Sequence, residues 1–289
     1  MKRTKLLLLT LMTMVLSVTT SCLDNDNDND RISVQVKYDR VFSSVRNSAT
    51  GTTFNSPETV YTIEIDYTNR LMRIGVNNIR LNQTDDSHTF VLEGVKLTSA
   101  TTDGALLAEA TSLQPVDGIT VTDLKVSLRD RVIDGIYRPV YSISYTVNSD
   151  YQVTVVPNTC YYFGTLTSVN DATGATFTKT NLPVEVTFDL ATNKAKMRLK
   201  GVKFVAAMPR ELDMTFPGID FTTSPAGYSL KASSIIPEIG EDPYPGYPIT
   251  NLNATATMSS GKLESTFTCT PEKMGAYTVS LSLSPQIFQ

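Results

Sequence analysis

The chain has 289 residues, of which 41% are apolar and 19% charged, and a formal net charge of −4. This length suffices for two domains of ordinary size, and the apolar content is that of a globular protein. The acidic balance provides no basic surface, so we expect no nucleic-acid partner.

The amino terminus has the pattern of a secretion signal. Three basic residues precede an apolar run over residues 6–18, and small residues follow up to Cys22. The run is too short to cross a bilayer core of roughly 30 Å, which favours a cleaved leader over residues 1–21. One alternative is an ordinary signal cut at this place, with a chance cysteine behind it.

The other alternative rests on residues 18–22 (VTTSC), which resemble a bacterial lipobox. The resemblance implies cleavage before Cys22, diacylglycerol on its sulfur and an acyl chain on its nitrogen. Several acyl chains give stable anchoring where one does not. We therefore expect a protein that is anchored to a membrane without spanning it.

Residues 22–30 are expected to form an acidic tether, because aspartate and asparagine alternate through residues 24–30. Such a run buries no surface and stays solvated. Behind a lipidated cysteine it resembles the surface-export signal of Bacteroidota lipoproteins, which implies an outer-membrane protein that faces the cell exterior. A calcium loop is the alternative, but Asn29 and Gln35 stand where its glycine and its bidentate glutamate are needed.

The rest of the chain is a tandem duplication. Residues 49–54 (ATGTTF) return 123 residues later as residues 172–177 (ATGATF). Aligned without a gap around this motif, the copies share eight identities in forty-four positions, and their apolar residues stay in phase. A shared phase indicates a shared fold, because a slip of one residue turns every side chain to the opposite face. We predict a first β-barrel repeat over residues 31–156 and a second over 157–289.

Alternation of apolar and polar residues predicts about eight strands in each copy and almost no helix. In the second copy the later strands are expected over 228–232, 250–257, 263–269 and 277–283. The repeated Asp66 and Asp189 are expected at hairpin turns, where an aspartate accepts hydrogen bonds from amides just ahead of it.

The apolar phase breaks at the same place in both copies. Val76 is followed three residues later by Ile79, as Leu199 is by Val202. An extra residue of this kind indicates a β-bulge, which bends a strand and lets a sheet curl.

The predicted fold is therefore all-β, with two duplicated antiparallel domains that are either closed barrels or two-sheet sandwiches. A single transmembrane barrel of sixteen strands is a further alternative. The succession of residues 164–167 (GTLT), 201–204 (GVKF), 248–252 (PITNL) and 261–263 (GKL) resembles the calycin-like, or lipocalin-like, barrel domains of Bacteroidota lipoproteins. This resemblance covers most of the second copy and brings no catalytic residues with it.

Residue types that carry chemistry are sparse. His88 is the single histidine, and no phosphate loop, nucleophile elbow or Cys-x-x-Cys motif occurs. We expect no catalytic residue, no metal and no cofactor; an enzyme acting on a polysaccharide, with two carboxylates across a cleft, is the less favoured alternative. Cys160 and Cys269 leave two alternatives, a disulfide or two buried thiols.

Binding is predicted for residues 238–248, a proline-rich segment that adds about four residues relative to the first copy. Tyr244 and Tyr247 stand beside Glu241 and Asp242, and rigid tyrosines stack on sugars or fill a partner's pocket. A plug over the end of a barrel is the alternative. The sequence thus predicts a non-catalytic binding or adhesion module for a small molecule, a glycan or a surface protein, with a structural or pilus-type envelope subunit as the alternative.

Overall fold

The computed structural model describes residues 33–100, 105–133, 136–224, 226–257, 260–272 and 274–285, without the side chains of 99, 100 and 130–139. The predicted leader over residues 1–21, the lipid-attachment residue Cys22 and the tether over 22–30 lie outside the described residues. The described part is all β, and no helix in it is long and apolar enough to cross a membrane.

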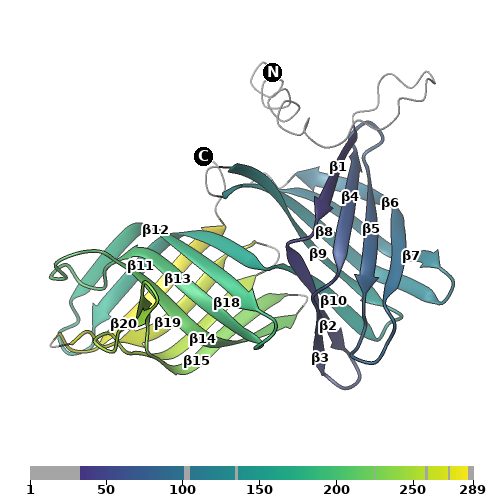
Figure 1. The fold of residues 1–289 in the computed structure, drawn as a ribbon. Coiled ribbons are helices and arrows are strands. Elements are labelled where there is room, and N and C mark those ends of the chain that lie inside the picture. Colours follow the sequence, from purple (N-terminus) through teal and green to yellow (C-terminus); the bar gives the residue numbers. More distant parts are fainter. Residues whose placement is uncertain are drawn as a thin grey trace, which may run out of the picture. The chain divides into compact units, whose positions relative to one another are not determined.

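The first copy folds into one antiparallel sheet of ten strands that curls on itself (Figure 1). Its strands are β1 Ser33–Tyr38, β2 Val41–Asn47, β3 Thr53–Ser56, β4 Val60–Asp66, β5 Leu71–Ile79, β6 His88–Ala100, β7 Leu106–Val116, β8 Ile119–Ile133, β9 Ile136–Val147 and β10 Tyr151–Pro157. Their order is β1-β4-β5-β6-β7-β8-β9-β10-β2-β3. The sheet ends at β1 and β3, so its ladder does not close into a ring.

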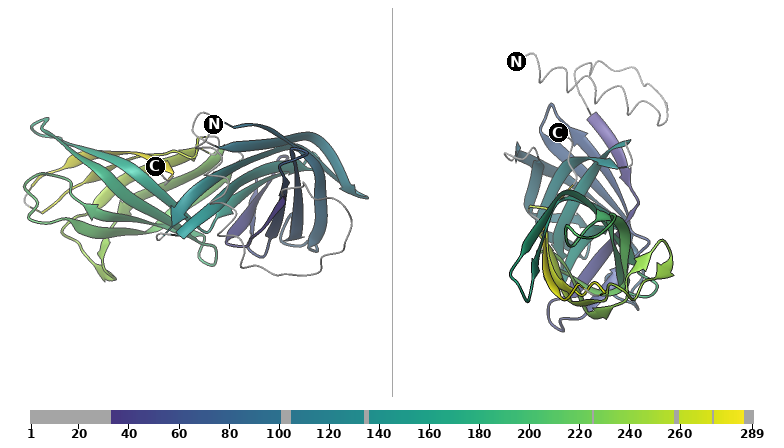
Figure 2. Two further views of the ribbon diagram at one scale, coloured as in Figure 1. Left: turned by 90° about the horizontal axis from the view of Figure 1, so that it is seen from above. Right: turned by 90° about the vertical axis from the view of Figure 1, so that its left-hand side faces the viewer.

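The second copy forms a closed antiparallel barrel. Its strands are β11 Thr159–Asn170, β12 Thr176–Asp189, β13 Lys194–Val202, β14 Leu212–Ser224, β15 Gly227–Ile235, β16 Glu238–Ile239, β17 Asp242–Pro243, β18 Ile249–Thr257, β19 Leu263–Cys269 and β20 Tyr277–Pro285. Eight of them follow the order β13-β12-β11-β20-β19-β18-β15-β14, and a pairing of β13 with β14 completes the ring. The right-hand view of Figure 2 looks onto one end of this barrel.

These two sheets decide between the predicted architectures. A single barrel of sixteen strands is wrong, because each copy builds its own sheet. A sandwich is wrong for the second copy, because its eight strands close on themselves. The later strands of the second copy lie where the alternation predicts them, and β20 alternates strictly between buried and exposed residues.

Each sheet encloses its own core, and the two cores are rich in aliphatic and aromatic side chains. Fully buried examples are Tyr61, Ile63, Ile74, Leu92 and Ile143 in the first copy and Leu166, Met197, Phe216, Leu230 and Leu263 in the second. Burial of one such side chain contributes about 1.5–3 kcal/mol. The interior of each sheet is therefore a packed core made by inward-facing residues.

The duplication extends to backbone detail. Strands β5 and β13 begin and end at positions 123 residues apart. Left-handed φ angles recur at the same separation, in the pairs Gly51 (71°) and Gly174 (69°), Arg70 (56°) and Asn193 (53°), and Asn78 (59°) and Gly201 (66°). The pairing register shifts between Val76 and Ile79 and between Leu199 and Val202, which confirms the predicted bulges.

The repeated motif is a turn that an asparagine holds. The Oδ1 atom of Asn47 accepts hydrogen bonds from the amides two and three residues ahead, at 2.9 and 3.0 Å. Asn170 makes the same pair of bonds at 3.0 and 2.9 Å. Asparagine suits this position because the oxygen of its short side chain accepts hydrogen bonds from backbone amides that a tight turn leaves without a backbone acceptor.

The repeated aspartates have the predicted turn role. Asp66 accepts a hydrogen bond from the amide of Asn69 at 2.8 Å, and Asp189 accepts one from the amide of Ala191 at 3.0 Å. The Thr192 hydroxyl, and then the neighbouring amides, lower the pKa of Asp189 because they stabilise its ionised form.

The two copies also pack against one another, around Phe42. This residue of β2 belongs to the core cluster of the second copy, where its ring lies edge-on to Phe188 at 5.6 Å and to Phe221 at 6.2 Å. The hydroxyls of Ser44 and Thr223 form a hydrogen bond beside it. Both faces of β2 are therefore buried, one by its own sheet and one by the barrel.

Candidate functional site

The predicted binding segment connects β15 to β18. In the first copy the corresponding strands, β7 and β8, are joined by a turn at Asp117 and Gly118, whereas residues 236–248 intervene in the second. The connection between the strands is therefore lengthened by more than the four residues that the sequence predicts. Part of the difference arises because β7 and β8 are longer than β15 and β18, so less of the first copy is left for the turn. Strands β16 and β17 form a hairpin within it, with Gly240 at a φ of 69° in the turn, and β16 also pairs with β14.

Two tyrosines of this segment form a stacked pair. The ring centroids of Tyr244 and Tyr247 are 5.4 Å apart, with 25° between the planes. Tyr247 is half-buried against the barrel core and lies 6.3 Å from Phe204. Burial, and then the neighbouring Tyr244 and Cys269, raise the pKa of Tyr247. Tyr244 itself is 42% exposed, so the core fixes one ring while the other presents an open face.

The hairpin sets the direction of the side chains next to Tyr244. The ladder of β16 and β17 continues through a hydrogen bond from the Tyr244 amide to the Pro237 carbonyl, at 2.7 Å. Because successive residues of an extended strand point to opposite faces, Asp242 and Tyr244 share one face. Glu241 lies exposed in the turn itself. Ile236, at the start of the segment, is 54% exposed.

A third carboxylate comes from the connection between β19 and β20. The amide of Glu272 donates a hydrogen bond to the Gly246 carbonyl at 2.8 Å. A Cβ placed on Gly246 would lie 3.5 Å from Tyr244 Cε1 and 3.8 Å from Glu272 Oε2, so ring and carboxylate flank the same point. We refer to Tyr244, Tyr247, Glu241, Asp242 and Glu272 together as the Tyr244 surface.

The structure thus brings the predicted site residues together on one short segment. The predicted plug describes one of the two tyrosines. Tyr247 packs against the core as a plug residue does, whereas Tyr244 is exposed to solvent. Glu272 was not predicted. Its contact depends on how two distant connections meet, and no local pattern in the sequence marks that meeting.

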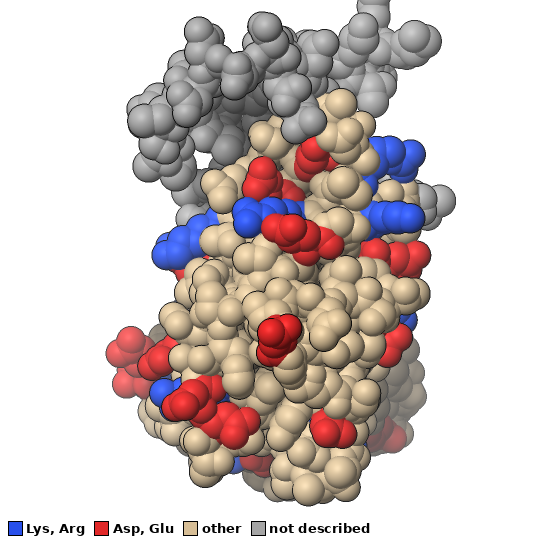
Figure 3. Space-filling view, turned by 90° about the vertical axis from the view of Figure 1, so that its right-hand side faces the viewer, with Lys and Arg blue, Asp and Glu red and all other residues tan. Residues whose placement is uncertain are grey.

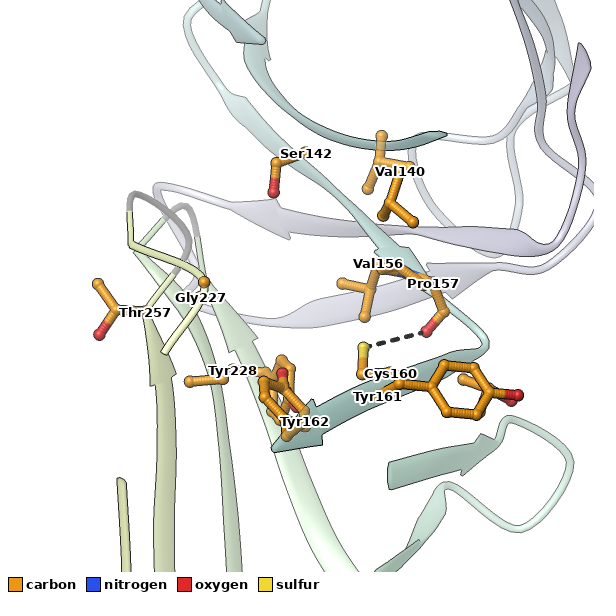
Figure 4. A pocket seen from close by; sticks show the side chains of 14 residues that line it. Val140, Ser142, Val156, Pro157, Cys160, Tyr161, Tyr162, Gly227, Tyr228 and Thr257 are labelled. Atoms are coloured by element: carbon orange, nitrogen blue, oxygen red, sulfur yellow. Dashed lines mark hydrogen bonds between the residues drawn. The ribbon is translucent and has the colours of Figure 1, made fainter. Parts of the chain in front are cut away.

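The larger of the two cavities measured in the described part has a volume of about 60 Å³. It lies where the copies meet, with Cys160, Tyr162 and Tyr228 on one side and Val140 and Ser142 on the other (Figure 4). Burial, and then Tyr162, raise the pKa of Tyr228 well above its usual value. Pockets for drug-sized ligands have roughly 300 Å³ or more. This cavity therefore does not fit a ligand of that size.

The two cysteines are separate buried thiols, so the alternative of a disulfide between them is wrong in this structure. Cys160 lies under the carbonyl of Pro157, with its Sγ 3.9 Å from that oxygen (Figure 4). Burial raises the pKa of the Cys269 thiol. The Cys269 thiol is therefore not favoured in its reactive, ionised form.

Several charges on the outer faces of the sheets are paired, and Figure 3 shows acidic and basic side chains side by side on one such face. The pairs are Glu64 and Glu93 with Arg73, Glu185 with Lys200, Asp213 with Arg198, Glu211 with Lys179, and Asp220 with Lys194. His88 begins β6 and is half-buried. Within the described ranges, no group of three or more His, Cys, Asp and Glu residues is arranged to hold a metal ion.

No family model matches the chain, and neither the curated proteins nor the solved structures compared with it give a significant match. The chemistry of the Tyr244 surface is therefore the basis on which a function is assigned.

Proposed function

We propose that the protein is a lipid-anchored outer-membrane protein that faces the cell exterior and binds a partner, without catalysis, through the Tyr244 surface. The leader over residues 1–21, the anchor at Cys22 and the tether over 22–30 are the sequence basis for the address. The observation that carries the binding role is Tyr244, an exposed ring whose position is fixed by Tyr247 and the barrel core.

A fixed aromatic ring suits binding for an energetic reason. Ordering a free side chain at an interface costs about 0.5–1.5 kcal/mol. Tyr244 is already ordered by its stacking on Tyr247, which in turn contacts Phe204 inside the barrel. The ring therefore offers a large contact area for which little further ordering is needed.

The partner is expected on the outside of the barrel. Inward-facing residues fill each sheet as a packed core, and the cavity of about 60 Å³ where the copies meet is too small for a drug-sized ligand, which favours a glycan or a surface protein over a small molecule in the lumen. No carboxylate is among the described residues that line that cavity, which gives a polysaccharide-acting enzyme no support there. A pilus-type subunit needs a long free edge for strand addition, whereas β1 and β3 have six and four residues.

An array of immobilised oligosaccharides and peptides tests the binding role. The full-length protein in detergent is compared with the Tyr244→Ala variant and with Tyr67→Ala, a control that removes a 36% exposed tyrosine of the first copy. We expect Tyr244→Ala to lower retention on at least one class of probe by about tenfold, and Tyr67→Ala to leave it unchanged. Equal retention of all three proteins, or no retention of any, would contradict the proposal.

Membrane fractionation tests the address separately. Replacing Cys22 by alanine should abolish incorporation of an alkyne-labelled fatty acid and release the protein from the outer-membrane fraction, because the acyl chains supply the anchoring. Labelling that persists in the Cys22→Ala variant would contradict the lipid anchor without bearing on the Tyr244 surface.

A further inference from the structure

We infer that the partner presents a cation, such as an arginine or lysine side chain on a protein or peptide, which lies on the open face of Tyr244 between its carboxylates. This inference rests on the proposed binding function and names the chemistry of the ligand. It follows from two independent features of the Tyr244 surface, its charge and its exposed ring.

The hairpin of the Tyr244 surface is acidic. The chain has no lysine or arginine between Lys231 and Lys262, and Lys273, next to Glu272, lies outside the described residues. Within the described residues, no ion pair involves Glu241, Asp242 or Glu272. On the sheets, six acidic side chains each have a basic partner at 4 Å or less. Three exposed carboxylates with no ion pair to a described basic residue create a local negative potential that attracts a cationic ligand.

The exposed ring favours the same kind of ligand. The face of a tyrosine ring carries negative charge density, and a cation within about 6 Å of the ring centre is attracted to it. Glu272 Oε2 and the Tyr244 ring both lie within 4 Å of the point where a Cβ on Gly246 would stand, so the two groups are neighbours. A guanidinium group stacked on the ring can thus reach that carboxylate with its N–H donors. A neutral sugar would use the ring but gain nothing from the three charges.

A peptide that carries two arginines between glycines, displayed on a biosensor, is the direct probe. Its control is the same peptide with citrulline, which has the shape and most of the hydrogen-bond donors of arginine but no charge. We expect the full-length protein in detergent to bind the arginine peptide at least about fivefold more tightly than the citrulline peptide. Raising the NaCl concentration from 50 to 300 mM should reduce this preference, because salt screens exposed charges.

Substitutions at Tyr244 and Glu272 distinguish the contribution of the ring to peptide binding from that of the charge. Tyr244→Ala should weaken binding of the arginine peptide about fivefold, Tyr244→Phe should retain it, and Glu272→Gln should weaken it about threefold. Ile236→Ala, at an exposed apolar residue outside the Tyr244 surface, and Glu109→Gln, an exposed acid of the first copy, are the matched controls and should change nothing.

Each other outcome overturns the inference. If arginine and citrulline peptides bind alike, or if Glu272→Gln and Asp242→Asn bind as wild type does, the ligand is not recognised by its charge. A neutral oligosaccharide that is retained through Tyr244, with no binding of the arginine peptide, would leave the proposed function standing and reject the cation. Binding of every probe that is indifferent to Tyr244→Ala would reject both.

Discussion

The two copies of the repeat form similar curled sheets, but only the second closes into a barrel. In the second copy β11 runs unbroken through twelve residues and pairs with both β12 and β20, which closes the barrel. In the first copy the corresponding segment is split into β1, which pairs with β4, and β2, which pairs with β3 and β10. The partner strand β12 is likewise divided in the first copy, into β3 and β4. A shared pattern of apolar residues thus fixes the curl of a sheet, while closure depends on an unbroken hairpin of β11 and β12.

One pair of residues marks the difference. Gly164 of β11 lies so close to β20 that a Cβ would meet the Ser282 carbonyl oxygen at 2.2 Å and Leu283 Cα at 2.9 Å. The position 123 residues earlier holds Val41, where β2 begins after the split. The glycine therefore permits the backbone approach that continuous pairing requires, and a branched side chain at the same position accompanies the break.

The division of the strand has a second consequence. Once β2 is separate from β1, its outer face is free to pack against the barrel, and Phe42 enters the aromatic group of Phe188 and Phe221. The first copy thereby supports the second, and the second carries the insertion with the Tyr244 surface. Duplication followed by this divergence gives one supporting sheet and one barrel that carries the proposed binding surface.

The largest effect is expected from Phe42→Ala, which removes the contact between the copies. Loss of a fully buried phenylalanine should lower the free energy of unfolding by about 4 kcal/mol, through lost burial and a cavity among three rings. Chemical denaturation followed by circular dichroism measures this loss. Phe163→Ala, at a ring that is 40% exposed, is the control with little expected effect. Equal midpoints for both variants would show that the copies do not depend on this contact.

Gly164→Val gives the second copy the residue of the first. We expect a loss of about 3 kcal/mol, because the clash is with backbone atoms that cannot move aside alone. The reverse change, Val41→Gly, should have a smaller effect, since it only removes side-chain packing. Thermal unfolding compares the two variants. A wild-type melting temperature for Gly164→Val would exclude close strand approach as the cause of closure.

Alkaline pH should destabilise the first copy. Burial raises the pKa of Tyr61 to about 12, even though hydrogen bonds with Ser43 and Tyr145 oppose the shift. The pKa in the unfolded chain is near 10, so this stability is complete below pH 10 and is lost as the pH rises to about 12. The loss reaches about 2–3 kcal/mol. Denaturation between pH 9 and 12 should show a shallower decline for Tyr61→Phe than for wild type; parallel declines would contradict this.

The smallest effects test whether the repeated turn contributes equally to the stability of the two copies. Asn47→Ala and Asn170→Ala each remove two hydrogen bonds to turn amides at nearly identical distances. Each exposed turn should lose about 1 kcal/mol or less. Because the geometry is the same, the two variants should differ by less than the error of a denaturation experiment. A clear difference would mean that closure of the sheet affects even its outer turns.

Much of this fold can be predicted from local patterns in the sequence. Alternating residues predict the strands, Asp66 and Asp189 predict their turns, and the phase breaks predict the bulges, because each depends on residues close together in the chain. The burial of Phe42 on the outer face of its strand is not predictable in this way, since it depends on the other copy. Tyr244 and Tyr247 stand out by composition, whereas Glu272 joins them only through tertiary folding.

Hydrogen exchange of the full-length protein, with and without the arginine peptide, tests the central claim most directly. Binding at the Tyr244 surface predicts slower exchange in residues 236–248 and around Glu272, and no change in β7 and β8, the counterparts that lack the insertion. Protection confined to the first copy, or exchange that is unaltered at saturating peptide, would contradict a binding role for this surface.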